Sequence, residues 1–264
     1  MRQAFDTLVR RIATAAGPER TDRNNRWLAA GLTFTAGMVN SVGFLAVSVY
    51  TSHMTGLVSM AADEIVLGGY YFAFLAALGV FSFIAGAMAC AILFNWGRRN
   101  RHISKFALIL WVEALAILLV GLLADRSQEA GLPWLIVMVL AWIMGLQNGL
   151  ITKVTEAQIR TTHVTGMVTD IGIELGKWLY RNPAGDPDPV LPHLPRLKLH
   201  ATLVSMFFLG GVFGALLGTW IGFYTVLPAA GILLLLAFYP VYVDFRYGKF
   251  RPGKVLRRAR SGTR

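Results

Sequence analysis

Six apolar stretches run along this chain, and they limit its fold more than any other feature. They lie at about 28–48, 70–95, 106–124, 132–152, 201–221 and 225–243. A helix of roughly 20 apolar residues is long enough to cross a bilayer. The composition agrees, because 55% of the residues are hydrophobic and only 15% are charged. The sequence therefore predicts an all-α polytopic membrane protein with six transmembrane helices.

The chain also contains an internal repeat. Residues 53–59 (His-Met-Thr-Gly-Leu-Val-Ser) are nearly copied by residues 163–169 (His-Val-Thr-Gly-Met-Val-Thr). Each copy follows a Gly-x-x-Asn sequence, at 37–40 and at 145–148, so the offsets are 110 and 108 residues. Repeats in membrane proteins are typical of transporter-like folds, in which the binding site lies between the repeats.

Each half holds three apolar stretches and one shorter, more polar helix, expected at about 55–68 and about 165–180. We divide the chain into a basic tail at 1–26, a first membrane repeat at 27–126, a second at 131–246 and a basic tail at 247–264. The first tail is either a short helix on the inner membrane face or a solvated segment, and no cleaved signal peptide is expected. Residues 181–196, rich in Pro and Asp, predict an irregular loop.

The basic residues predict the topology. With the N-terminus inside, 24 of the 25 Lys and Arg residues fall in inner segments, and only Arg126 lies outside. This bias predicts that both termini are cytoplasmic. Because each half crosses three times, the halves are expected to form inverted repeats. The net charge of +11 is explained by these loops, so we expect the lipid bilayer and no nucleic acid as a partner.

The repeated turns are the predicted binding site for a small solute. If the preceding segments return towards the membrane centre, the short helices begin near the midplane from opposite sides, and their dipoles favour an anion. Thr can cap free N–H groups there, and Gly permits close approach. The candidate substrate-binding residues are Asn40, His53, Thr55, Gly56, Gln147, Asn148, Thr162, His163, Thr165 and Gly166. The alternative is structural: Thr and Gly only cap and pack helices, and the amides only hold loops.

Buried and interfacial acids are the next candidates. Glu113 lies near the centre of an apolar stretch, where a carboxyl group must be protonated or paired, so it is a proton-coupling candidate or a neutral hydrogen-bonding group. Four acids lie on the short helices and either line a vestibule or have no role: Asp63, Glu64, Asp170 and Glu174.

No metal, cofactor or enzymatic activity is predicted. Neither His53 nor His163 has a second ligand at metal-binding spacing. The chain has no serine elbow, Cys/His pair, Walker loop or dinucleotide fingerprint, and its single cysteine, Cys90, is expected to be buried.

A glycine seam lies in the fifth apolar stretch, at Gly210, Gly214, Gly218 and Gly222. Such a seam lets helices pack closely. It is expected to pack within the chain or to form a homodimer.

These motifs resemble the YoaK-like family of bacterial inner-membrane proteins, whose function is unknown. The resemblance rests on residues 36–44, 53–56, 144–149 and 160–166, and it covers about residues 28–245. It implies a bacterial multi-pass inner-membrane protein with no established substrate or cofactor. The chain departs from the family pattern at Asn40, where Asp is common, and at Leu57, where Asn is common, so the first half is less polar.

Two functional hypotheses follow. The first is a secondary transporter or permease for a small polar or anionic solute, with its site between the repeated turns. The second is a non-transporting membrane scaffold or a module that senses the envelope through its basic tails.

Overall fold

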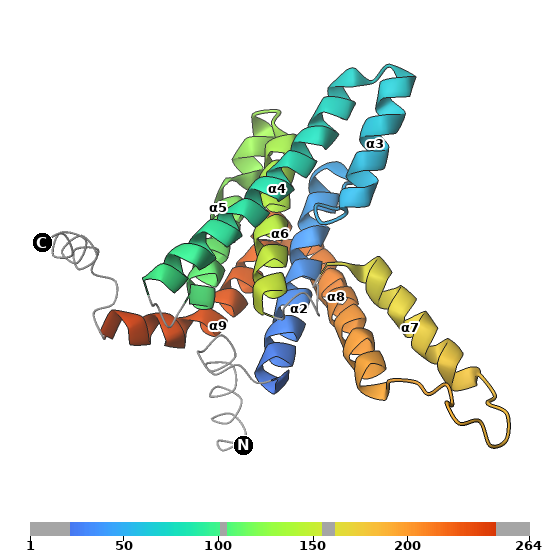
Figure 1. The fold of residues 1–264 in the computed structure, drawn as a ribbon. Coiled ribbons are helices and arrows are strands. Elements are labelled where there is room, and N and C mark those ends of the chain that lie inside the picture. The colour runs from blue at the N-terminus through green and yellow to red at the C-terminus, as the bar shows by residue number, and fades with distance from the viewer. Residues whose placement is uncertain (1–21, 101–104, 155–161, 247–264) are drawn as a thin grey trace, which may run out of the picture.

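The computed structural model describes residues 22–100, 105–154 and 162–246 (Figure 1). Its long helices are α2 (Asp22–Val47), α4 (Tyr70–Arg99), α5 (Lys105–Glu129), α6 (Pro133–Val154), α8 (Leu194–Ile221) and α9 (Val226–Arg246). The short helices are α3 (Met54–Leu67) and α7 (Val164–Leu179), and a 3-10 turn, η1 (Gly222–Thr225), separates α8 from α9. The predicted all-α fold is confirmed. Apart from positions 22–26, the two predicted basic tails lie outside the described residues.

Five described stretches are long and apolar enough to cross a membrane. They are Asn25–Leu45, Tyr70–Arg99, Phe106–Glu129, Pro133–Val154 and Leu194–Phe238. The last is 45 residues long and runs through α8 and η1 into α9. It therefore includes the predicted span at 201–221 and the first 14 residues of the one at 225–243, and a count of six crossings stays a prediction.

The helices α2 and α6 form the centre of the molecule. Of the most apolar window in each helix, 67% is buried in α2 and 61% in α6, but only 17% in α4. The outer face of α4 instead exposes large apolar side chains such as Phe74, Phe81 and Met88. An apolar outer face of this kind suits contact with lipid.

Glycines set the closest helix crossings. A Cβ at Gly37 of α2 would collide with the carbonyl oxygen of Phe207 in α8, and one at Gly210 would collide with that of Phe34. The crossing of α4 with α6 repeats this arrangement. There, Gly86 lies against the carbonyl oxygen of Trp142, and Gly145 lies against that of Phe83. Backbone contact this close is available only to residues without a side chain.

The glycine seam of α8 is occupied within the chain. Gly210 and Gly214 are buried against α2, and a Cβ at Gly218 would collide with Leu45 of α2. Gly222 does not extend the seam, because its φ of 58° and ψ of −133° end α8 there. Of the two alternatives for this seam, packing within the chain is the one that the structure shows at Gly210, Gly214 and Gly218.

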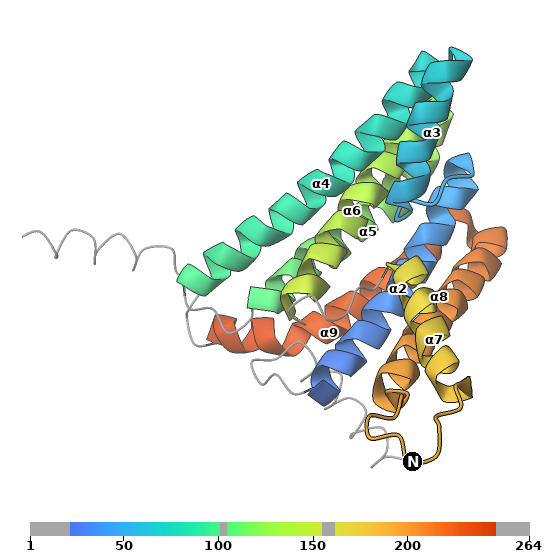
Figure 2. The same cartoon turned by 45° about the vertical axis from the view of Figure 1, so that its right-hand side comes forward.

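The two short helices run to opposite ends of the molecule. Figures 1 and 2 show that α3 and α7 both begin near mid-height, that α3 runs beside α4 to one end, and that α7 runs beside α8 to the other. The irregular segment after α7 ends earlier than predicted, because α8 begins at Leu194. Pro195 explains this early start, since its fixed φ suits the first turn of a helix.

Candidate functional site

The repeated turns have the same local structure. His53 and His163 are the N-caps of α3 and α7, and neither side chain makes a capping hydrogen bond. The Thr of each motif is the second helical residue, so the prediction that Thr is the cap is wrong. A Cβ at Gly56 would collide with the ring of His53, and one at Gly166 would lie about 2.5 Å from Nδ1 of His163. The glycine therefore makes room for the histidine that precedes it by three residues.

The first turns of the short helices are open. The side chains of His53, Thr55, His163 and Thr165 are exposed. The first N–H groups of a helix have no partner within the helix, and neither cap supplies a side-chain acceptor. Each turn therefore presents an exposed hydroxyl group and an exposed imidazole at a helix N-terminus that has no side-chain cap.

Two asparagines hold these turns in place. The Oδ1 atom of Asn40 accepts from the backbone N–H of Ser52 at 3.0 Å and is 3.4 Å from Oγ1 of Thr51. In the second half, Nδ2 of Asn148 donates to Oγ1 of Thr162 at 2.7 Å. In the described structure, both amides thus tie the end of a long helix to the turn before a short one.

Gln147 faces a different environment from its neighbour Asn148. Its Nε2 atom donates to Oε1 of Glu113 at 2.7 Å and lies 3.3 Å from Oγ1 of Thr35. All three side chains are fully buried, and they come from α6, α5 and α2. A polar cluster in an apolar core is stable only when its members satisfy one another. Glu113 therefore belongs to a core cluster, not to the exposed turns.

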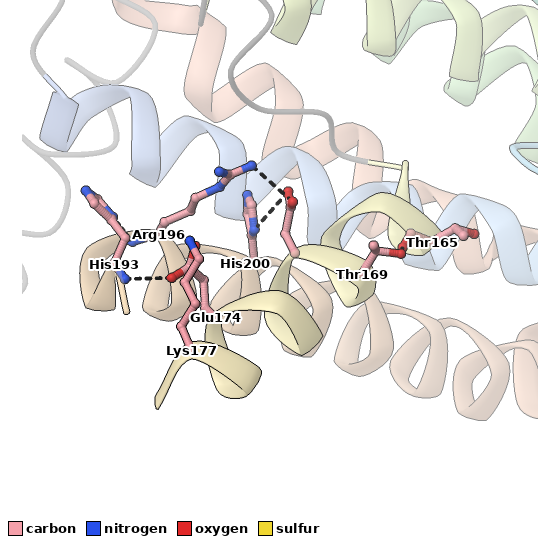
Figure 3. A network of polar contacts seen from close by, with 8 residues as sticks. Thr165, Thr169, Glu174, Lys177, His193, Arg196 and His200 are labelled. Atoms are coloured by element: carbon pink, nitrogen blue, oxygen red, sulfur yellow. Dashed lines mark hydrogen bonds and ion pairs between the residues drawn. The ribbon is translucent and has the colours of Figure 1, made fainter. Parts of the chain in front are cut away.

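A second polar cluster fastens α7 to α8 (Figure 3). Asp170 lies 3.0 Å from Nη2 of Arg196 and 3.4 Å from Nδ1 of His200. One turn further along α7, Glu174 accepts from the backbone N–H of His193 at 2.6 Å and pairs with Lys177 at 3.0 Å. These two acids therefore bind the start of α8. Asp63 on α3 is exposed, and Glu64 lies against Gly69, the N-cap of α4.

Glu174 makes this attachment sensitive to acid. The His193 N–H and the Lys177 ammonium group hold the pKa of Glu174 below its usual value of 4.5. A carboxyl group whose pKa is lowered by folding stabilises the folded state at pH values above its ordinary pKa. This stabilisation is lost as the pH falls through the lowered pKa. We expect the protection factors of the α7 amides, which correct for the intrinsic pH dependence of hydrogen exchange, to fall below pH 4.5. The Glu174→Gln variant should lose this acid dependence, whereas Asp63→Asn should keep it; equal behaviour of the two variants would contradict the assignment.

Several partners of these groups stand outside the repeated motifs that the sequence displays. They are Thr35, Arg196 and His200. Thr35 had a usable signal, because the equivalent position in the second half is Ile143, while the equivalent of Gln147 in the first half is Val39. At each of these two positions one copy is polar and the other is apolar, which separates Thr35 and Gln147 from the motifs that the two halves share. In the described parts of the chain, no three His, Cys, Asp or Glu side chains form a group that could hold a metal.

Long apolar helices, an apolar outer face and a buried polar cluster define this molecule as an all-α, multi-span membrane protein. The chain belongs to the family described as "Protein of unknown function (DUF1275)", whose model matches residues 28–239. This match confirms the resemblance to the YoaK-like family. No curated protein and no solved structure matches the chain.

Proposed function

We propose that this protein is a secondary transporter or permease for a small polar or anionic solute, bound between the turns that open α3 and α7. One observation carries the proposal: two matching, exposed turns begin near mid-height and open helices that run to opposite ends. Helices that are interrupted within the membrane are typical of transporter binding sites. Both N-terminal dipoles would favour negative charge at this site.

We also propose that the two halves are inverted repeats. The support is a set of contacts that recur at constant offsets. Gly37 contacts Phe207, and Gly145 contacts Phe83. Gly145 lies 108 positions after Gly37 in the sequence, and Phe83 lies 124 positions before Phe207. The His–Gly contact of each turn and the Asn anchor before it also recur.

The proposed topology places the protein in the bacterial inner membrane with both termini in the cytoplasm. The distribution of Lys and Arg supports it, because 24 of the 25 then lie on the inner side. In this topology α2, α4 and α5 cross in the first half, and α6, α8 and α9 cross in the second. The short helix α3 then approaches the site from outside, and α7 approaches it from the cytoplasm.

Glu113 is the proposed proton carrier. Its carboxyl group is fully buried, and its Oε2 atom has no hydrogen-bond partner within the described residues. A carboxylate in an apolar core is costly, so this group favours the neutral, protonated state. Loss and recovery of that proton would link solute movement to a pH gradient.

Replacing Thr165 tests the site. In liposomes with an imposed pH gradient and a panel of radiolabelled carboxylates, phosphates and sugars, we expect Thr165→Val to reduce uptake of the transported solute by about tenfold. That factor corresponds to one lost hydrogen bond of about 1.4 kcal/mol. The matched control is Thr169→Val, one turn further along the same exposed face, where the hydroxyl group bonds to the carbonyl oxygen of Thr165.

Two outcomes would count against the proposal. Equal uptake by the wild type and Thr165→Val would contradict the placement of the solute site at the α7 turn. No uptake of any solute by the wild type, together with a stable partner protein that is lost on deleting residues 247–264, would favour the scaffold hypothesis instead.

A further inference from the structure

Two adjacent amides on α6 connect different parts of the molecule. Consecutive helical residues point about 100° apart, so Gln147 and Asn148 face different neighbours. Gln147 donates to Glu113 in the core, and Asn148 donates to Thr162 in the turn before α7, each at 2.7 Å. A movement of this one turn of α6 therefore acts on both the buried carboxyl group and the candidate solute site.

Ionisation of Glu113 would disturb this arrangement. In the neutral acid, Oε1 accepts from Gln147, and the proton lies on Oε2, which has no partner among the described residues. After proton loss, Oε2 carries negative charge and requires a donor, because an unpaired buried charge is strongly unfavourable. The Gln147 amide is already bonded to this carboxyl group, so it is placed to respond by moving.

The turn before α3 lacks a connection of this kind. Asn40 holds Ser52 much as Asn148 holds Thr162, but the residue before Asn40 is Val39. Val39 is buried in the apolar core and has no hydrogen-bonding side chain. Of the two repeated turns, the one before α7 is therefore the one tied to an ionisable core group.

We propose that Gln147 and Asn148 are positioning residues that relay the protonation state of Glu113 to the turn that opens α7. The inference rests on the proposed function, because it assigns a regulatory input to one half of that solute site. Protonated Glu113 holds α6 and the turn in the described position. Loss of the proton shifts Gln147, and the adjacent Asn148 transmits the shift to Thr162.

Other ionisable groups surround these elements. Cys90 on α4 interacts electrostatically with Glu113 and with Lys153 on α6. On α9, the described side chain of Tyr242 is exposed. The α7 helix has His163 at its N-cap and carries Lys177. Its two acids contact the start of α8. Asp170 contacts Arg196 and His200, and Glu174 contacts the backbone of His193. A pH response of α7 that comes from these groups must be separated from one that comes from Glu113.

A fluorescent probe makes this separation. In the full chain with Cys90→Ala, reconstituted in lipid nanodiscs, bimane is attached at Val168→Cys on α7 or, as the matched control, at Val58→Cys on α3. These positions are equivalent in the repeat and similarly exposed, at 51% and 56%. From about pH 5 to about pH 9, we expect the emission change at position 168 to exceed that at position 58 by about fivefold.

Two variants decide the origin of the response. Glu113→Gln, which cannot ionise, should reduce the change at position 168 by about fivefold, and Thr162→Val should do the same by removing the acceptor in the turn. Thr162→Val leaves the core cluster untouched, so it remains informative if Glu113→Gln does not fold. A full response in either folded variant, or an equal response of the α3 probe, would overturn the relay. The measurement uses no solute, so its result is independent of whether the protein transports one.

Discussion

Gly210→Ala is expected to destabilise the protein by about 1–3 kcal/mol, the usual cost of overpacking a well-packed interface. The added methyl group would meet the carbonyl oxygen of Phe34, which is backbone and cannot rotate away. The helices α2 and α8 would have to separate along their closest contact. Thermal unfolding in detergent measures the effect through Cys90, the single cysteine, which is fully buried and reacts with a thiol-specific dye only when the protein opens.

The neighbouring glycine supplies the control. A Cβ at Gly211 would lie 3.8 Å from Oγ of Ser41 and 3.9 Å from the carbonyl oxygen of Gly37, which are ordinary contact distances. Gly211→Ala is therefore expected to be neutral or to stabilise the helix by up to about 1 kcal/mol. Equal destabilisation by both variants would show that the Phe34 contact does not determine the effect.

The second large effect is expected from Gln147→Leu, at about 1–3 kcal/mol. This change removes the donor to Oε1 of Glu113, so both oxygens of a fully buried carboxyl group lack a partner among the described residues. Because lipid surrounds the bundle, water does not readily replace the lost hydrogen bond. The same Cys90 reactivity measurement reports the loss.

A double variant separates this cause from a general packing defect. Removing both partners of a buried hydrogen bond costs less than removing one, because no polar group is left unsatisfied. We expect Glu113→Leu combined with Gln147→Leu to be more stable than Gln147→Leu alone. A double variant that is less stable by the sum of the two single effects would indicate that the groups do not interact.

Much of the fold could be predicted from the sequence because lipid imposes a simple pattern. Helices of about 20 apolar residues are conspicuous, and the repeat revealed α3 and α7 to within one residue of their bounds. The sequence does not show whether the glycine seam packs against a helix of the same chain or against a second copy, because both kinds of close packing select the same small residues. The structure shows that Gly210 and Gly214 face α2.

The candidate site was predicted less completely. The repeat identifies His53, Thr55 and their second copies as a set, and Asn148 is among the candidate residues that the structure brings to its turn. Gln147 is adjacent in sequence, but the rotation of the helix turns it towards Glu113. Long-range pairs such as Gln147 with Thr35, or Asp170 with Arg196, depend on how helices cross, and hydrophobic periodicity carries no information about that.

The packing of α2 in the first half against α8 in the second half affects how the chain is assembled. The main partner of α2 is α8, whose first residue, Leu194, is synthesised 147 positions after Val47 ends α2. At ribosomal rates this interval is on the order of ten seconds. During that time the glycine face of α2 has no permanent neighbour and must be sheltered by lipid, the insertion machinery or a chaperone. A ribosome that stalls before α8 emerges would therefore release a fragment with this face uncovered, which quality-control proteases could recognise.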